Sequence, residues 1–71
     1  MKRYYSVMTK YYFDGYVSAF FNKSCLLDEC PISTKIEKAD YYLYIDWFGS
    51  LDEVERYINN LKNAFDMKFV S

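Results

Sequence analysis

The second half of this chain changes its hydrophobic period once, and that change most constrains the fold. Over residues 40–48, apolar side chains alternate with polar or amphipathic ones, a period of two that is typical of a strand with one buried face. After Gly49, apolar residues recur at three- and four-residue spacing, which predicts a helix with one apolar stripe. The stripe consists of Leu51, Val54, Ile58, Leu61 and Phe65. Each element must bury one face, so the sequence predicts a helix packed on a sheet.

The start of the helix has its own signal. Ser50 and Glu53 have the spacing of a capping box, in which the serine caps the helix and the glutamate reaches back. Asp52 and Glu53 also place negative charge at the positive end of the helix dipole. We therefore expect the helix at about 51–65, with residues 66–71 fraying, adding a short fourth strand at 67–70, or tucking under the sheet.

The N-terminal half predicts a β-hairpin. Residues 4–12 and 16–23 are rich in aromatic and β-branched types, and Asp14-Gly15 between them is typical of a type I′ turn. A two-residue loop would pair Tyr12 with Val17, and one face would then carry Met8, Tyr12, Val17, Ala19 and Phe21. The other face would carry Tyr5, Val7, Tyr11, Phe13, Tyr16 and Phe20. Small side chains favour the first face as core, although a one-residue slip would exchange the two.

Residues 24–39 follow no period and predict a long irregular segment, with Lys35–Lys38 as an irregular edge or a short turn. The length of 71 residues allows one domain, residues 1–71. The predicted fold class is α+β. It is a three-stranded antiparallel sheet in β-β-β-α order, with the C-terminal helix on one face.

Composition restricts the function classes. Nine basic and ten acidic residues give a net charge of −1, whereas nucleic-acid binders usually carry a basic excess. Histidine, the commonest general base and metal ligand, is absent. Asp40 and Asp46 lie about 20 Å apart along one strand at ~3.3 Å per residue, too far to act on one bond. We therefore expect no enzyme, no catalytic residue, no metal and no cofactor.

The hydropathy predicts a compartment, and that compartment in turn predicts the state of the cysteines. Cys25 and Cys30 are too few for a zinc site, and we expect two free thiols, with a local or intermolecular disulfide as the alternative. No apolar run approaches the ~20 residues of a membrane span, and the N-terminal residues do not resemble a signal peptide. We expect a cytoplasmic protein without membrane contact.

Tyrosine is the residue type that points to a function. Nine of the 71 residues are tyrosine, which offers contact area and a hydroxyl at little entropic cost. Because an unpaired Asp46 would be costly in a small core, we expect Leu43, Ile45 and Trp47 to face the helix. The opposite, open sheet face is then the expected partner-binding surface, with Tyr42, Tyr44, Asp46, Tyr11, Tyr16 and Phe20. A homodimer through this face is a further expectation. The alternatives are that these rings only cover one another as cross-strand pairs, or that residues 66–71 fold over this face.

Two segments, Lys10–Val17 and Tyr44–Glu55, resemble those of short proteins from bacterial phages and mobile elements. That class includes anti-CRISPR and other anti-defence inhibitors. The resemblance implies a protein that occludes the surface of a host defence protein in a bacterial cytoplasm, and it assigns no functional residue. Such a protein would bind through the aromatic sheet face, the irregular segment 24–39, or both. A sheet-based nucleic-acid-binding module is the second hypothesis, for which Lys2, Arg3, Lys10 and Lys23 would supply the basic cluster.

Overall fold

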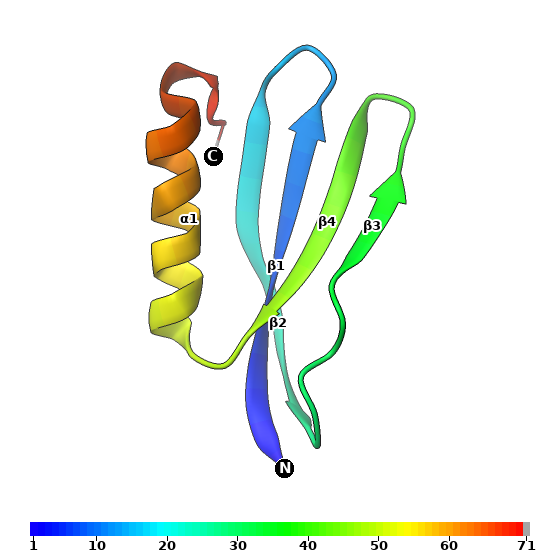
Figure 1. Ribbon diagram of the computed structural model, residues 1–71, viewed down its shortest axis with the longest axis vertical. Helices are drawn as coiled ribbons and strands as arrows, with labels where there is room; N and C mark the ends of the chain where they lie inside the picture. Colours follow the sequence, from blue (N-terminus) through cyan, green and yellow to red (C-terminus); the bar gives the residue numbers. More distant parts are fainter. Residues whose placement is uncertain (71) are drawn as a thin grey trace.

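Four antiparallel strands and one helix make up the computed structural model, which describes residues 1–70 (Figure 1). The elements are β1 (Lys2–Tyr12), β2 (Val17–Leu27), β3 (Thr34–Glu37), β4 (Tyr41–Phe48), α1 (Leu51–Phe65) and the short 3-10 helix η1 (Asp66–Lys68). The strands lie in the order β2-β1-β4-β3. The α+β class, the antiparallel sheet and the C-terminal helix predicted from the sequence are confirmed. No helix within residues 1–70 is long and apolar enough to cross a membrane.

The fourth strand lies in the segment predicted to be irregular. β3 pairs with β4 as the edge of the sheet, and all four of its residues are exposed. Its charged side chains, Lys35 and Glu37, are typical of edge strands, where charge opposes pairing with further chains. The expectation of a fourth strand at 67–70 is wrong: η1 is followed there by a single parallel bridge, in which the Val70 amide donates to the Val17 carbonyl across 2.7 Å.

The hairpin turn differs from the expected type I′ turn. The amide of Tyr12 donates to the carbonyl of Tyr16 across 2.8 Å, and the amide of Gly15 donates to the carbonyl of Tyr12 across 3.0 Å. Gly15 has φ +99°, and Asp14 does not have a positive φ. The loop therefore has three residues and ends in a glycine bulge, so that Tyr11, and not Tyr12, pairs with Val17.

This one-residue difference decides which face of β1 meets the helix. Val7 belongs to the buried cluster that includes Val54 and Leu61 of α1, and Tyr5 packs against this cluster. Met8 and Tyr12 point to the opposite side, so their assignment to the core was wrong. On β2, Val17 and Ala19 lie on the helix side, as predicted. The buried cluster consists of Val7, Ala19, Val54 and Leu61, surrounded by the partly buried Tyr5, Phe48, Tyr57, Ile58, Phe65 and Phe69.

The helix has the predicted bounds. Ser50 Oγ accepts a hydrogen bond from the amide of Glu53 across 3.2 Å, so the expected cap is present. The Glu53 carboxylate reaches back to the amide of Gly49, at 2.9 Å, one residue before the position that a capping box predicts. Within the predicted stripe, Leu51 is 57% exposed, and the stripe that contacts the sheet begins at Val54.

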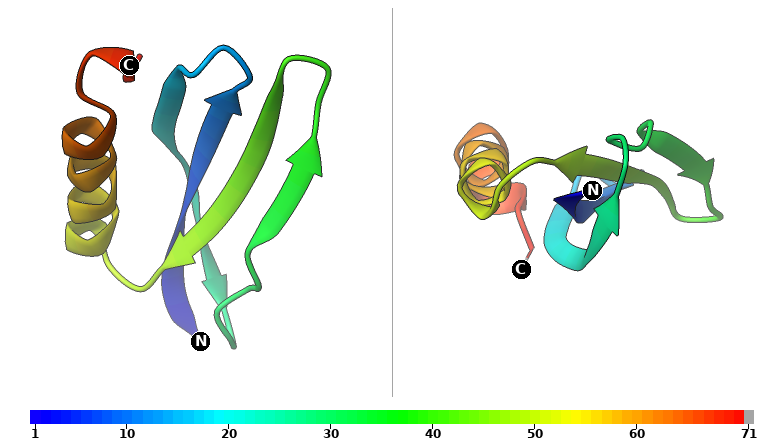
Figure 2. Two further views of the ribbon diagram at one scale, coloured as in Figure 1. Left: turned by 45° about the horizontal axis from the view of Figure 1, so that its top comes forward. Right: turned by 90° about the horizontal axis from the view of Figure 1, so that it is seen from below.

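The orientation of β4 is the reverse of the expectation. In the register with β1, Asp46 lies opposite Val7 and Tyr44 opposite Thr9, so both share the side of the sheet on which α1 lies. Leu43, Ile45 and Trp47 therefore point away from the helix. Figure 2 shows α1 beside the β2–β1 part of the sheet, with β3 at the far side, and this leaves the helix-side surface of β4 partly uncovered.

Candidate functional site

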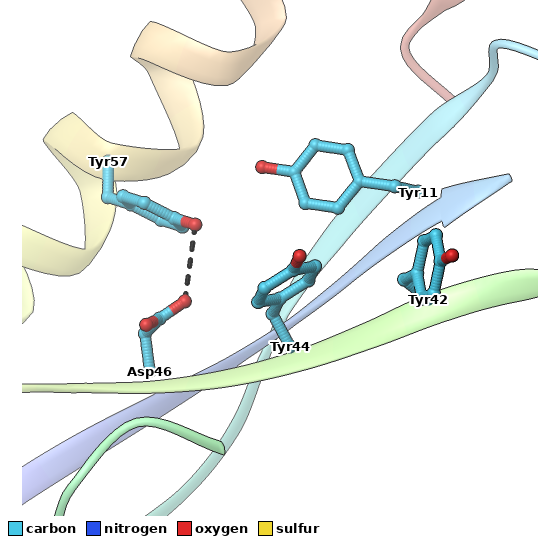
Figure 3. A pocket seen from close by; sticks show the side chains of 5 residues that line it. All are labelled: Tyr11, Tyr42, Tyr44, Asp46 and Tyr57. Atoms are coloured by element: carbon cyan, nitrogen blue, oxygen red, sulfur yellow. Dashed lines mark hydrogen bonds between the residues drawn. The ribbon is translucent and has the colours of Figure 1, made fainter. Parts of the chain in front are cut away.

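A pocket of about 420 Å³ opens on the helix side of the sheet. We call it the tyrosine pocket; its lining residues are Tyr11, Tyr42, Tyr44, Asp46 and Tyr57 (Figure 3). The alternation of β4 places its even-numbered residues on this side, and the pairing of Tyr11 with Tyr42 adds one ring from β1. Tyr57 comes from α1 and lies with Asp46 at one end of the pocket, while Tyr42 lies at the other end.

The rings of the pocket are held by edge-to-face contacts. Tyr11 and Tyr44 stand almost perpendicular, at 88° with centroids 5.3 Å apart. Tyr11 also meets Phe65 of α1 at 5.9 Å, and Tyr42 meets Phe13 at 5.1 Å. Such contacts are favourable because the positive edge of one ring meets the negative face of the other. The rings are therefore positioned before any ligand arrives.

Asp46 is half-buried at the helix end of the pocket. Its Oδ2 accepts a hydrogen bond from the hydroxyl of Tyr57 across 3.3 Å, and its Oδ1 accepts one from Ser33 Oγ across 2.7 Å. Both donors are neutral, so they satisfy the carboxylate without cancelling its charge. An unpaired aspartate is indeed costly near a core, but here a helix tyrosine and a loop serine, which are distant in sequence, supply the partners.

Burial and the nearby carboxylate change the acidity of two phenols. Desolvation raises the pKa of Tyr57 to about 12; the hydroxyl of Thr9, 3.4 Å away, opposes the rise, and the charge of Asp46 adds to it. Desolvation likewise raises the pKa of Tyr11, with a smaller contribution from the same carboxylate. Both phenols are neutral at pH 7, so they serve as ring walls and hydrogen-bond donors.

An ammonium group of the same chain already lies over two rings that line the pocket. Lys35 stands opposite Tyr44 in the β3–β4 register. Its Nζ lies 4.4 Å from the centroid of the Tyr42 ring and 5.7 Å from that of Tyr44. Both distances are within the ~6 Å over which a cation is attracted to a ring face. The two rings therefore present their faces toward the β3 side of the pocket.

The structure brings together four of the six residues that the sequence indicated for binding. Tyr11, Tyr42, Tyr44 and Asp46 line the tyrosine pocket, although on the helix side of the sheet and not on its open face. The other two lie elsewhere. Phe20 is on the opposite face, with Lys10 Nζ 5.8 Å from its ring, and Tyr16 is at the end of the hairpin, with Lys68 Nζ 4.8 Å from its ring.

Two further residues were not predicted from the sequence: Tyr57, which lines the pocket, and Lys35, whose ammonium group lies over two of its rings. Tyr57 follows Val54 by three residues and precedes Leu61 by four, so its position in the helical stripe was a usable signal. For Lys35 no signal existed, because the pairing of β3 with β4 has no periodic pattern in the sequence.

The sheet face away from α1 has no covering layer among the described residues. We call it the helix-free face; it includes Met8, Tyr12, Phe20, Ile36, Tyr41, Leu43, Ile45 and Trp47. Leu43 is only 7% exposed, because neighbouring side chains cover it, but Phe20 and Ile36 are 42% and 41% exposed. This face is a second, apolar surface distinct from the tyrosine pocket.

Other chemistry is sparse in residues 1–70. No group of three or more His, Cys, Asp or Glu side chains is placed to hold a metal ion. Cys25 is half-buried, Cys30 is exposed, and both are free thiols. No protein-family model, curated protein or solved structure matches this chain.

Proposed function

We propose that this chain is a small, non-enzymatic protein-binding module whose partner docks on the tyrosine pocket. One observation carries the proposal: four tyrosine rings from three different elements converge with a half-buried carboxylate on one open surface. Aromatic side chains in partly desolvated pockets are the residues that dominate the affinity of protein–protein contacts. Polar hydroxyls on the same rings give such a surface specificity as well as contact area.

The rigidity of the rings supports binding. Tyr11 is held between Tyr44 and Phe65, and Tyr57 is fixed by its contact with Asp46. A partner that inserts a side chain between these rings does not have to order them first, so less affinity is lost to conformational entropy.

The chemistry of the pocket does not favour catalysis. Its lining comprises four phenols and one carboxylate, and the pKa values of Tyr11 and Tyr57 are shifted upward, away from neutral pH. A general acid or base works best with a pKa near the working pH. The carboxylate is engaged by two hydroxyls, and a second carboxylate is not part of the lining.

The class of partner follows from the resemblance to short phage and mobile-element proteins. We propose that the partner is a host protein of a defence system, and that this chain inhibits it by covering its surface. The alternative is a nucleic-acid-binding module that uses the helix-free face, where Lys10 Nζ lies 5.1 Å from the ring of Tyr41. Binding to generic duplex DNA that weakens steeply with salt would favour this alternative.

The experiment is a quantitative pull-down from a bacterial host lysate with mass spectrometry. The double variant Tyr42→Ala/Tyr44→Ala should keep the fold and lose ~2 kcal/mol or more of partner binding. Tyr41→Ala is the matched control, because it removes a ring from the same strand on the opposite face. Equal capture by the double variant and the wild type would exclude the tyrosine pocket as the binding surface.

A further inference from the structure

The tyrosine pocket combines two kinds of negative potential. The faces of its phenol rings carry the negative part of the ring quadrupole. At one end, Asp46 contributes a full carboxylate charge, and its two hydrogen bonds come from the neutral hydroxyls of Tyr57 and Ser33. A half-buried carboxylate beside ring faces, in a medium less polar than water, attracts a cation more strongly than an exposed one does.

The position of Lys35 shows which cation the rings accept. Its Nζ lies 4.4 Å from the centroid of Tyr42, so this ring face already carries an alkylammonium group from the same chain. Lys35 is exposed and belongs to the edge strand β3. Its long side chain can turn into solvent without breaking a strand pair, so it is a displaceable occupant of the Tyr42 and Tyr44 ring faces.

The shape of the pocket fits an alkylammonium group better than a bare ion. The perpendicular rings of Tyr11 and Tyr44 form two walls, and Tyr57 with Asp46 closes one end (Figure 3). The volume of about 420 Å³ has room for an ammonium head and part of its carbon stem. Rings arranged in this way around a cation form an aromatic cage, which suits an N-methylated ammonium because methylation reduces the hydration that must be lost.

We propose that the tyrosine pocket binds the side chain of a lysine, preferentially an N-methylated lysine, of the partner protein, and that Lys35 competes for the same ring faces. The inference rests on the proposed function, because it assumes that the partner docks at this pocket. Asp46 neutralises the ligand, Tyr11, Tyr42 and Tyr44 surround it, and Tyr57 holds the carboxylate in place.

The test is an NMR titration of the isolated protein, followed through its backbone amide signals. The probes are Nα-acetyl-Nε-trimethyllysine methylamide, the corresponding unmethylated lysine compound, and a neutral tert-butyl isostere of the trimethylated side chain. We expect the trimethylated probe to bind at the pocket about tenfold more tightly than the neutral isostere, with the unmethylated probe between them. Equal binding of the charged and neutral probes, or no binding of any probe, would overturn the proposal.

Variants make the assignment specific. Asp46→Asn keeps a side-chain acceptor but removes the charge, and it should lower the affinity for the trimethylated probe about tenfold. Lys35→Ala should raise the affinity for the trimethylated probe about threefold, because the competing cation is gone. Tyr41→Leu, on the opposite face of β4, should leave the affinity unchanged. If Asp46→Asn lowers the melting temperature, Tyr42→Leu replaces it, because Tyr42 lies at the far end of the pocket.

The outcomes separate this inference from the proposed function. Affinity that is unchanged in Asp46→Asn or in Lys35→Ala would overturn the cation site. If the cation site is overturned but the double variant Tyr42→Ala/Tyr44→Ala still fails to capture the partner, the pocket remains a protein-binding surface with a different ligand. If the probe binds as expected while the pull-down is unaffected, the cation site stands and the docking proposal fails.

Discussion

The hydroxyl of Tyr57 donates a hydrogen bond to Oδ2 of Asp46 across 3.3 Å, and this contact joins α1 to β4. It explains why an aspartate sits on the side of the sheet that also carries the core. With Ser33 on the second oxygen, both carboxylate oxygens have a donor, and the charge stays available to the tyrosine pocket. One contact therefore both stabilises the packing of the helix and sets the electrostatics of the candidate site.

The stability of the fold should depend on pH through Tyr57. Burial raises the pKa of Tyr57 from the ordinary value of 10.0 to about 12. Between these two values the unfolded chain releases the phenol proton and the folded chain keeps it, so the free energy of unfolding falls as pH rises. Below pH 10.0 both states are protonated and the contribution is fully present.

Tyr57→Phe tests this dependence by urea denaturation at a series of pH values. The variant should lose about 1 kcal/mol at neutral pH, because the hydrogen bond to Asp46 is gone. It should also show a shallower decline above pH 10.0 than the wild type. Tyr16→Phe, at the exposed end of the hairpin, is the control. Parallel curves for wild type and Tyr57→Phe would contradict the raised pKa.

The residues of the helix stripe should contribute unequally to the free energy of unfolding. Leu61 belongs to the buried cluster, whereas Leu51 is mostly exposed. Leu61→Ala should cost on the order of 2–4 kcal/mol, enough to unfold much of a small domain. Leu51→Ala should change the free energy of unfolding by less than about 0.5 kcal/mol. A melting temperature that is the same in Leu61→Ala and the wild type would contradict the packing of α1 on the sheet.

The turn at Gly15 should tolerate no β-branched residue. Its φ is +99°, and no heavy atom beyond its two chain neighbours lies within 4 Å of the place where a Cβ would be. The cost of Gly15→Val is therefore conformational and not a clash, about 1–2 kcal/mol. Gly49→Ala is the matched control, because that glycine has no positive φ and a Cβ there would only touch Glu53. Equal urea midpoints for the two variants would show that Gly15 does not need its left-handed conformation.

The helix-free face should mediate self-association, because Phe20 and Ile36 expose large apolar side chains on it. We expect the wild type to form a dimer at high concentration in sedimentation experiments. The double variant Phe20→Ser/Ile36→Ser should stay monomeric with nearly unchanged melting. Leu26→Ser, which removes an exposed apolar side chain from the outer end of β2, is the control. A wild type that is monomeric at all concentrations would contradict this role of the face.

Local sequence signals were enough to predict the helix and its start. The apolar spacing from Val54 to Phe65 and the cap at Ser50 act between residues within one or two turns of each other, so no other part of the chain was needed to read them. The same holds for the two hairpin strands and for the alternation of β4. Four of the six indicated binding residues also meet in one pocket, because alternation placed three of them on one face of one strand.

Which face of each strand meets the helix depends on contacts between residues far apart in the sequence. A period of two defines two faces but does not say which is inside, and both faces of β4 and of the hairpin carry enough apolar surface to be core. The choice was made by a three-residue turn in place of a two-residue one, and by Tyr57 and Ser33 reaching Asp46 from distant positions. The edge strand β3 was likewise decided by pairing with β4, since its charged residues carry no periodic signal of their own.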